Sequence, residues 1–375
     1  MPANRKALRV VIVTRGIGPS SFPWNELYAN DRAMSPGRHY PPVGVEFRFG
    51  QNGWRYEETG NRKRRYLALR PCAAIFYLLR LAYRGGTRRR PFVVHMHAPV
   101  VGFLGFWVRL FSWSVRIVTT QHNDWRYFRT HQKLGLAVAA LISDKYTTCG
   151  DSLRATIPER IRSRLDRKHK LVSIPNAINT SFIAEYPERQ PDGDRSKIAV
   201  VVARMAPQKN CFFILDLFRA CAPLERLIWF GDGDQRHAIE SAIERQGLRS
   251  QIELRGNRPR EEVYSTLSSS GFYINASHWE GLCVADLEAA ALGCWPIMSD
   301  IIQRREVAKS LNIGLYPLTE TTSWCSEVSR FLDLSIDDQM RLRREIAARA
   351  REAFGLDKML AGYSKLYNEV VAESE

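Results

Sequence analysis

Short apolar runs alternate with helix-like stretches in two series along this chain, on either side of a segment rich in Pro, Gly and charge. The first series contains five expected strands: LRVVIVT (8–14), VGVEFRF (43–49), FVVHMH (92–97), VRIVTT (115–120) and KYTTCG (145–150). Apolar periodicity predicts helices near 67–84, 101–112 and 131–142. This alternation is typical of a parallel sheet that is covered by helices on both faces.

The segment YPERQPDGDRSK (186–197) ends the first series, and the alternation then resumes. The second series predicts strands at KIAVVVA (197–203), RLIWFGDG (226–233), QIELRG (251–256), GFYINAS (271–277), CWPIMS (294–299) and IGLYP (313–317), and late helices near 335–353 and 356–373. We therefore expect an α/β protein of two doubly wound Rossmann-like domains facing a central cleft. The expected parts are a domain of residues 1–185, a linker of 186–196, a domain of 197–355 and a helix, 356–375, that packs back on the first domain.

Charge is distributed unevenly between the two halves. Residues 1–190 hold 32 Lys and Arg against 12 Asp and Glu, although the whole chain has a formal charge of only +16. A polyanionic partner for the first half is indicated: nucleic acid, anionic lipid or a phosphorylated substrate. None of the seven cysteines forms a C-x-x-C pair, which favours free thiols in a reducing compartment and no zinc site. The longest apolar stretch is broken by Arg109 and Arg116, so we expect a cytoplasmic protein without a membrane-spanning helix.

Ligands of doubly wound sheets bind beyond the carboxyl ends of the strands, and the second series has cations at such an end. Arg204 and Lys209 follow VVVA directly and precede the helix-like CFFILDLFRA. Arg can fork across two phosphate oxygens and Lys supplies a point charge, so the pair suits a diphosphate. The alternative is that both are solvated loop residues.

Two acids, Glu280 and Glu288, lie in HWEGLCVADLEAAALGCWP (278–296). On a helix they would be roughly 12 Å apart along the axis, which exceeds the spacing of glycosidase carboxylates or of a two-metal site. Separate roles on one long ligand follow: Glu288 on a ribose, Glu280 on a sugar, and the N–H groups of Leu282, Cys283 and Val284 on phosphate oxygens. The alternative is a plain helix N-terminus with an acid for its dipole and a second, surface acid.

These elements in this order resemble glycosyltransferase family 4, the retaining glycosyltransferases of GT-B fold. The matching series is R-x-x-x-x-K-N (204–210), G-D-G (231–233), L-R-G-N-R-P-R-E-E-V (254–263) and E-G-L-C-V-A-D-L-E-A-A-A-L-G (280–293). The resemblance implies that Arg204 and Lys209 bind the donor diphosphate and that the backbone near Asn257 and Arg258 meets the base. It also implies Glu288 on the ribose, Glu280 on the donor sugar, and no metal or other cofactor. Cys283 departs from the family, where many members have Gly, and this puts the donor's pose in question.

The first series matches the family less tightly. VTRGIGPSS (13–21) offers Gly16 and Gly18 for close backbone approach to the donor phosphates, or for a plain strand–helix turn. The resemblance places His122 of TTQHND beside the transferred sugar. His97 of VVHMHAP would face the acceptor or cap the next helix, and Asp124 is the main acid expected near the acceptor.

Basic residues concentrate between 61 and 90, and they predict contact with an anionic membrane surface. The expected contact residues are Arg62, Lys63, Arg64, Arg65, Arg80, Arg84, Arg88, Arg89 and Arg90. Trp107 and Trp113 in the next stretch could act as interfacial anchors or pack in the core. The alternative for the basic helix is a core helix with one solvated edge.

Together these features favour a retaining hexosyltransferase that moves a sugar from a nucleotide-diphosphate sugar to a saccharide acceptor. The acceptor is expected to be lipid-diphosphate-linked, at the inner face of the cytoplasmic membrane, in bacterial polysaccharide or lipopolysaccharide assembly. A nucleotide-sugar epimerase remains an alternative, although it needs first-half carboxylates, which are few. A non-catalytic polyanion-binding protein is a second alternative, but nucleic acid would leave the second-half series unexplained.

Overall fold

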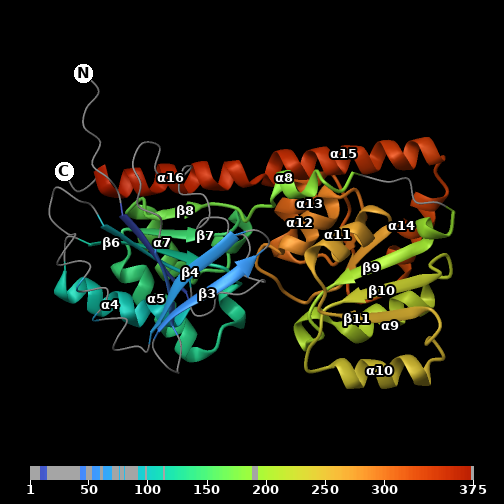
Figure 1. Ribbon diagram of the computed structural model, residues 1–375, viewed down its shortest axis with the longest axis horizontal. Helices are drawn as coiled ribbons and strands as arrows, with labels where there is room; N and C mark the ends of the chain where they lie inside the picture. Colours follow the sequence, from blue (N-terminus) through green and yellow to red (C-terminus); the bar gives the residue numbers. More distant parts are fainter. Residues whose placement is uncertain are drawn as a thin grey trace. The chain divides into compact units, whose positions relative to one another are not determined.

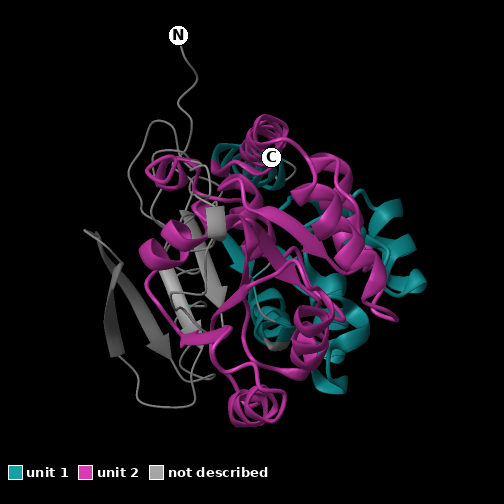
Figure 2. Ribbon diagram, turned by 90° about the vertical axis from the view of Figure 1, so that its right-hand side faces the viewer, with its two compact units in different colours: residues 1–176, 357–375 teal, residues 177–356 magenta. Residues whose placement is uncertain are grey.

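The computed structural model describes residues 9–14, 43–47, 53–59, 62–69, 76, 80, 92–97, 99–112, 115–187 and 193–372. The chain forms two compact units, residues 1–176 with 357–375 and residues 177–356, which are coloured separately in Figure 2. The units divide between Asn176 and Ala177, ahead of the expected linker, and the C-terminal helix groups with the first unit.

The first unit contains a sheet whose eight described strands run in the order β3-β4-β2-β1-β5-β6-β7-β8 (Figure 1). All neighbours pair in parallel except β3 and β4, which form an antiparallel hairpin. The strands are β1 (Arg9–Thr14), β2 (Val43–Phe47), β3 (Gly53–Thr59), β4 (Arg62–Leu69), β5 (Phe92–Met96), β6 (Val115–Gln121), β7 (Lys145–Thr148) and β8 (Leu171–Ser173). The five predicted strands are confirmed, whereas β3, β4 and β8 were not expected. The helix predicted from residue 67 is wrong at its start, because residues 67–69 pair with β2 and β3.

Helices cover both faces of this sheet, as side-chain alternation along β5 shows. Val94 and Met96 belong to the apolar core that includes Leu104 of helix α4 (Gly102–Phe111). His95 points to the opposite face and hydrogen-bonds with Tyr367 of α16 (Leu356–Ala372). The remaining described helical segments are η2 (Pro99–Val101), η3 (Trp125–Tyr127), α5 (Thr130–Ile142), α6 (Asp151–Arg154) and α7 (Glu159–Arg167).

The second unit contains a five-stranded parallel sheet in its described residues, ordered β11-β10-β9-β12-β13 (Figure 1). Its strands are β9 (Ile198–Val202), β10 (Arg226–Phe230), β11 (Ile252–Gly256), β12 (Phe272–Asn275) and β13 (Trp295–Met298). The strand order reverses between β9 and β12, which is the place where doubly wound sheets bind ligands. A strand at 313–317 was wrongly predicted: that segment makes one isolated bridge, between Ser299 and Tyr316.

Two helical segments precede β9, the first strand of the second unit, and helices follow each of its strands. They are α8 (Thr180–Ile183), η4 (Gly193–Lys197), η5 (Pro207–Lys209), α9 (Cys211–Ala220), α10 (Arg236–Arg245), α11 (Arg260–Ser268), α12 (Val284–Ala291), η6 (Ile302–Arg304), α13 (Arg305–Leu311), α14 (Thr322–Leu332) and α15 (Ile336–Phe354). Backbone conformation and close packing require glycine at position 231, directly after β10. Gly231 has φ +119°, and a Cβ there would lie 2.2 Å from the carbonyl oxygen of Ala203. The G-D-G motif therefore lets β10 approach the loop that follows β9.

Parts of the predicted site lie outside the described residues. These are Gly16, Gly18, Arg84, Arg88, Arg89 and Arg90. The backbone of Arg62, Lys63, Arg64 and Arg65 belongs to β4, and Arg80 is helical and exposed. Among the described helices, none combines the length and the apolar character that crossing a bilayer requires.

Candidate functional site

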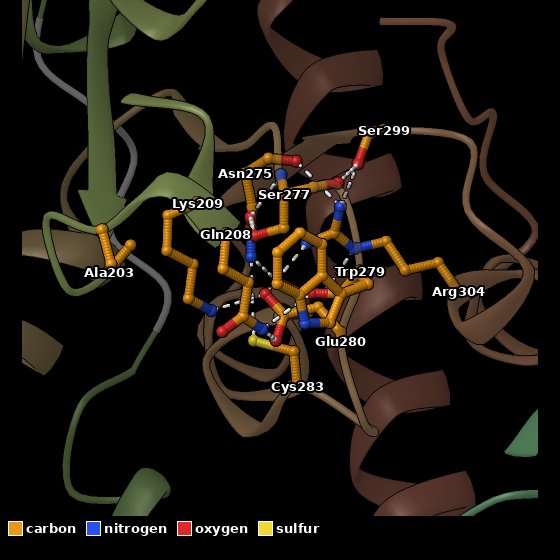
Figure 3. Close-up of polar contacts among 12 residues, drawn as sticks. Ala203, Gln208, Lys209, Asn275, Ser277, Trp279, Glu280, Cys283, Ser299 and Arg304 are labelled. Atoms are coloured by element: carbon orange, nitrogen blue, oxygen red, sulfur yellow. Dashed lines mark hydrogen bonds and ion pairs between the residues drawn. The ribbon is translucent and has the colours of Figure 1, made fainter. Parts of the chain in front are cut away.

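The loops after β9 and β12 are fastened to each other at the strand-order reversal. The backbone N–H of His278 donates to the carbonyl of Gln208 at 2.9 Å. The Gln208 side chain in turn donates from Nε2 to the carbonyl of Trp279 at 2.8 Å (Figure 3). Lys209 follows Gln208 and Glu280 follows Trp279, so these hydrogen bonds bring Lys209 and Glu280 next to each other.

Lys209 and Glu280 form a buried ion pair. Lys209 Nζ lies 2.5 Å from Glu280 Oε1, and Glu280 is only 6% exposed (Figure 3). Burial alone would lower the pKa of Lys209, but Cys283, Glu280 and Asp286 beside it outweigh burial and raise that pKa. The ammonium is therefore charged at neutral pH. The sequence assigned these two side chains to different groups of one donor, and the structure joins them directly.

A second buried pair, Asp286 and Arg304, supports the first, and the sequence did not predict it. Arg304 Nε donates to Asp286 Oδ2 at 2.8 Å, and both residues are 1% exposed. Asp286 Oδ1 also accepts from Tyr273 and Asn275, at 2.8 and 2.7 Å. Burial would raise the pKa of Asp286, but Arg304 and these hydrogen bonds outweigh it and hold the pKa below its ordinary value.

Arg304 also links this pair to Glu280. Its Nη1 donates to the carbonyl of Asn275 at 3.0 Å and to Ser299 Oγ at 2.5 Å. Its Nη2 lies 3.9 Å from Glu280 Oε1 (Figure 3). Glu280 is therefore held by Lys209 on one side and faced by a second cation on the other.

Glu288 lies on α12 in a separate polar environment. It is 9% exposed, accepts a hydrogen bond from the hydroxyl of Tyr264 on Oε1, and lies 3.9 Å from Arg260 Nε. Burial raises the pKa of this carboxyl, although Arg260 and Tyr264 act in the opposite direction. Tyr264 was also missed by the sequence. The spacing of Glu280 and Glu288 cannot be taken from helix rise, because only the last part of that interval is helical.

The N-terminus of α12 begins later than predicted. The helix starts at Val284, with Cys283 at the N-cap and Leu282 before it. Cys283 has φ −71° and ψ 113°, an ordinary extended conformation, so the backbone does not require the Gly that many relatives have. Burial, together with Asp286 and Glu280, raises the pKa of its thiol, which therefore stays neutral.

Three further predicted donor contacts are exposed. The side chain of Arg204 extends over Gly233 and, among the described residues, forms no ion pair. Asn257 and Arg258 follow β11 at the surface, and Arg258 donates from Nε to the carbonyl of Arg255 at 3.0 Å. The solvated guanidinium of Arg204 is suited to an incoming anion.

The first unit holds three imidazoles close together. His97 Nδ1 lies 3.1 Å from His122 Nε2, so one ring must donate and the other accept. His95, which the sequence did not single out, lies 3.9 Å from His97 between ring centroids, with the rings tilted by 45°, and hydrogen-bonds with Thr120 and Tyr367. Burial lowers the pKa of His122 to about 3 and those of His95 and His97 well below their ordinary value. All three rings are therefore neutral at physiological pH.

Asp124 has a structural task. Its carboxylate accepts from Arg126 Nε at 3.0 Å on both oxygens, and it caps η3 by accepting from the Arg126 backbone N–H at 2.8 Å. The residue is fully buried. A carboxylate engaged in this way is poorly suited to abstract a proton from a sugar carbon.

A cavity of about 880 Å³ in the second unit is separate from these residues. It is lined partly by Ile198 and Arg226, which begin β9 and β10, and by Ser265 and Ser269 of the α11 region. It therefore extends to the amino ends of the strands, away from the usual ligand position of such sheets.

Comparison with known proteins agrees with this geometry. Residues 182–353 match the family model of the glycosyl transferases group 1. That region is a group 1 glycosyl transferase domain. The matched range includes Arg204, Lys209, Glu280, Glu288 and Arg304.

Among the relatives of the glycosyl transferase domain, a phosphatidylinositol N-acetylglucosaminyltransferase chain of Arabidopsis thaliana is 31% identical over 127 residues, 33% of this chain and 28% of that protein. The next two curated relatives are matched over 62% and 65% of their length, so the chain spans less than two thirds of each. The solved sucrose-phosphate synthase of Thermosynechococcus elongatus superimposes with a TM-score of 0.75 at 15% identity, over 98% of this chain and all of that one. HepE of Anabaena in complex with UDP superimposes with a TM-score of 0.67 at 13% identity, over 98% and 99%. These likenesses confirm the GT-B fold class.

Proposed function

We propose that this protein transfers a sugar from a nucleotide-diphosphate sugar to a saccharide acceptor, with retention of anomeric configuration and without a metal. The observation that carries the proposal is the clustering at the reversal of the second sheet. Arg204 and Lys209 follow β9, Glu280 follows β12, and all three lie within a group 1 glycosyl transferase domain. Doubly wound sheets bind phosphorylated ligands at this position.

Each side chain has a chemical task in the proposal. The exposed guanidinium of Arg204 and the charged ammonium of Lys209 stabilise negative charge as the bond between the sugar and the diphosphate breaks. The acceptor hydroxyl attacks from the face that the diphosphate leaves, and its proton passes to the departing phosphate oxygen. Glu280 accepts sugar hydroxyls with the lone pairs that Lys209 does not use, and Glu288 accepts those of the ribose. In the first unit, the neutral imidazole of His122 suits hydrogen bonding to a sugar hydroxyl, with His97 on the acceptor side.

The proposed acceptor is a lipid-linked saccharide at the inner face of the cytoplasmic membrane, in polysaccharide assembly. The Arabidopsis relative is named for transfer to phosphatidylinositol, which is a lipid. The strong positive charge of residues 1–190 suits a phosphorylated lipid and an anionic leaflet. The epimerase alternative has lost its main first-half acid, because Asp124 is paired with Arg126.

The proposal is tested by donor binding and by turnover. A panel of nucleotide sugars is screened for thermal stabilisation, since a true donor raises the melting temperature by mass action. Release of nucleotide diphosphate from the best donor is then measured with and without saccharide acceptors, and the anomeric configuration of the product is read by NMR.

Glu280→Gln and Lys209→Ala should each lower turnover at least about a hundredfold, because they remove groups aimed at the reacting sugar and diphosphate. The matched control is Lys197→Ala, which breaks the exposed Lys197–Glu225 pair of the same unit and should leave turnover unchanged. Full turnover in both site variants would refute the assignment, and an inverted product would refute retention.

A further inference from the structure

Helix α4 exposes an unbroken apolar face. Five of its ten residues are large, apolar and solvent-exposed, from 38% for Phe103 to 64% for Phe111. They are Phe103, Phe106, Trp107, Leu110 and Phe111. Their spacing of three and four residues places them on one side of the helix. We call this set the α4 face.

The opposite side of α4 is already buried in the core of the first unit. Gly102, Leu104, Gly105 and Val108 are its buried residues. Its one charged residue, Arg109, donates to the carbonyls of Val115 and Ile142, each at 3.1 Å, and pairs with Asp144. A helix that is apolar all round is normally covered on every side. The α4 face is therefore a candidate binding surface.

The neighbouring helix extends this surface. The two helices pack so closely that a Cβ on Gly102 would lie 2.0 Å from the carbonyl oxygen of Gly135. Leu134 and Leu141 of α5 are 57% and 54% exposed and lie two turns apart on one side of that helix. On α4 itself, the Trp107 ring lies 5.8 Å from that of Phe106 and 6.2 Å from that of Phe111, so the aromatic rings form one continuous patch.

The charge of the sequence that contains α4 indicates what covers the α4 face. Neither α4 nor α5 contains Asp or Glu. The sequence from Thr59 to Asn123, which includes α4, holds 12 Lys and Arg and no acidic residue. A cationic stretch of sequence that presents exposed Trp, Phe and Leu is typical of segments that lie in the headgroup region of an anionic bilayer. A second copy of the chain would bring the same cations to the contact, and their repulsion would oppose a symmetric pair.

We propose that the α4 face, extended by Leu134 and Leu141, is the surface with which this protein binds an anionic membrane. The aromatic rings enter the interface between headgroups and acyl chains, and cations of the stretch 59–123 meet the lipid phosphates. The proposal deepens the proposed function, on which it rests for the lipid-linked acceptor. It adds an apolar anchor on α4 to the membrane contact that the basic stretch 61–90 predicts.

The test is co-sedimentation of the full chain with vesicles of phosphatidylcholine containing about 30% phosphatidylglycerol, compared with phosphatidylcholine alone. The double variant Phe106→Ser, Phe111→Ser should lower the partition coefficient at least about tenfold, because two aromatic side chains no longer leave water. Both residues are exposed, so the variant should keep the wild-type melting temperature. The matched control, Phe212→Ser with Ile336→Ser, alters exposed apolar residues of the second unit, which are 41% and 60% exposed, and should bind vesicles normally.

Trp107 gives a second readout that does not depend on removing the anchor. Lipids brominated near the headgroup should quench part of the tryptophan emission when the protein binds. In Trp107→Phe, which keeps an aromatic ring, binding should persist while that part of the quenching is lost. Unchanged quenching in this variant would overturn the proposal even if the double variant failed to fold.

Three outcomes contradict the inference. Equal vesicle binding by the wild type and the double variant would show that α4 is not the anchor. If the wild type binds no vesicles and forms a dimer that the double variant abolishes, the surface belongs to a second copy of the chain. If the wild type binds no vesicles and is a monomer, the surface belongs to another protein. Binding of UDP, measured by thermal shift in the absence of lipid, should be the same in all variants. A wild-type protein that binds UDP but not vesicles would contradict the inference alone, and a wild-type protein that binds vesicles but not UDP would contradict the proposed function alone.

Discussion

Arg304 is the side chain on which the buried polar network of the second unit depends most. It is 1% exposed and compensates the fully buried charge of Asp286. Arg304→Met should lower the free energy of unfolding of this unit by about 3–5 kcal/mol, since it leaves a buried carboxylate unpaired. Urea unfolding at pH 7 measures this. Arg305→Met is the matched control, because Arg305 pairs with Asp300 at the surface, and it should unfold almost as the wild type does.

The double variant Asp286→Asn, Arg304→Met separates the pair from its packing. If the cost of Arg304→Met arises from the unpaired acid, the double variant should regain a large part of the lost stability. A double variant as unstable as the single one would show that the loss comes from the cavity and from the carbonyl of Asn275 instead.

Tyr264 controls the protonation of Glu288. Its hydroxyl stabilises the charged carboxylate, so Tyr264→Phe should raise the already elevated pKa of Glu288 further. A protonated Glu288 accepts ribose hydroxyls poorly, and affinity for UDP therefore falls as pH drops through that pKa. We expect the acid limb of UDP binding, measured by calorimetry from pH 4 to 8, to move upward by about half to one pH unit in Tyr264→Phe.

Tyr186→Phe is the control for this shift. The Tyr186 ring packs edge-on against Tyr264, at 5.7 Å between centroids, but its hydroxyl does not reach Glu288 in any hydrogen bond of the described residues. Its pH profile should match the wild type. An unmoved profile in Tyr264→Phe would mean that Glu288 does not contact the ribose or is ionised throughout this range.

The sequence identifies individual site residues only where they follow a strand in a familiar order. Lys209, Glu280 and Glu288 were predicted in this way, and the structure brings Lys209 and Glu280 together where the strand order reverses. Asp286 and Arg304 were missed because their partnership joins α12 to η6, and no local spacing encodes it. Asn275 was the available signal: a polar residue at the end of the apolar strand FYIN needs a buried partner, and that partner is Asp286.

Among the elements, long apolar strands were predictable and charged edge strands were not. The β3–β4 hairpin reads GWRYEET and RKRRYLAL, whose charges resemble a solvated segment. Charged strands are tolerated at the edge of a sheet, where one side has no neighbour, and β3 is the terminal strand of its sheet. The segment 313–317 has a strand-like composition but makes only a single bridge to the end of β13.

The contact between β5 and α16 should make the first unit sensitive to acid. His95 is fully buried between Thr120 and Tyr367, and burial, followed by His122, lowers its pKa well below 6.5. The unfolded chain takes up a proton near pH 6.5 that the native state refuses, so stability falls as pH drops below that value. The share of His95 in this loss is about 1.4 kcal/mol per pH unit until the native pKa is reached, and the buried His97 and His122 add to it.

Urea unfolding at pH 7.5, 6.5 and 5.5, followed by hydrogen exchange in β5 and α16, measures this dependence. His95→Gln retains hydrogen-bonding groups and removes one titration, while His97 and His122 keep theirs, so it should reduce the slope below pH 6.5 by the His95 share. His131→Gln alters an exposed histidine of α5 and should leave the slope unchanged. Equal slopes in the wild type and in His95→Gln would contradict a neutral, buried His95.

In the whole molecule, the chain is divided into two units, and each unit has its own stabilising contacts. Unit boundaries were the hardest feature to predict, because the chain leaves the first unit at Asn176 and returns to it at Asp357. Ile178 and Gly355 form a bridge at these two passages within the second unit. Pairing between residues so far apart in the sequence leaves no local pattern. The Pro and Gly residues near 186–197 do form a local pattern, and the expected boundary was placed there.

A bound nucleoside diphosphate should therefore stabilise the second unit more than the first. In the part of the chain that the structure describes, the proposed contacts to base, ribose and diphosphate, from Arg204 to Glu288, belong to the second unit. UDP at a hundred times its dissociation constant should stabilise that unit by about 2.7 kcal/mol. In hydrogen exchange we expect UDP to slow the amides of β12 and α12 and to leave those of α4, α5 and α16 unchanged. Protection confined to the first unit, or a saturating UDP effect that Lys209→Ala does not weaken, would place the nucleotide elsewhere and end the assignment of this site.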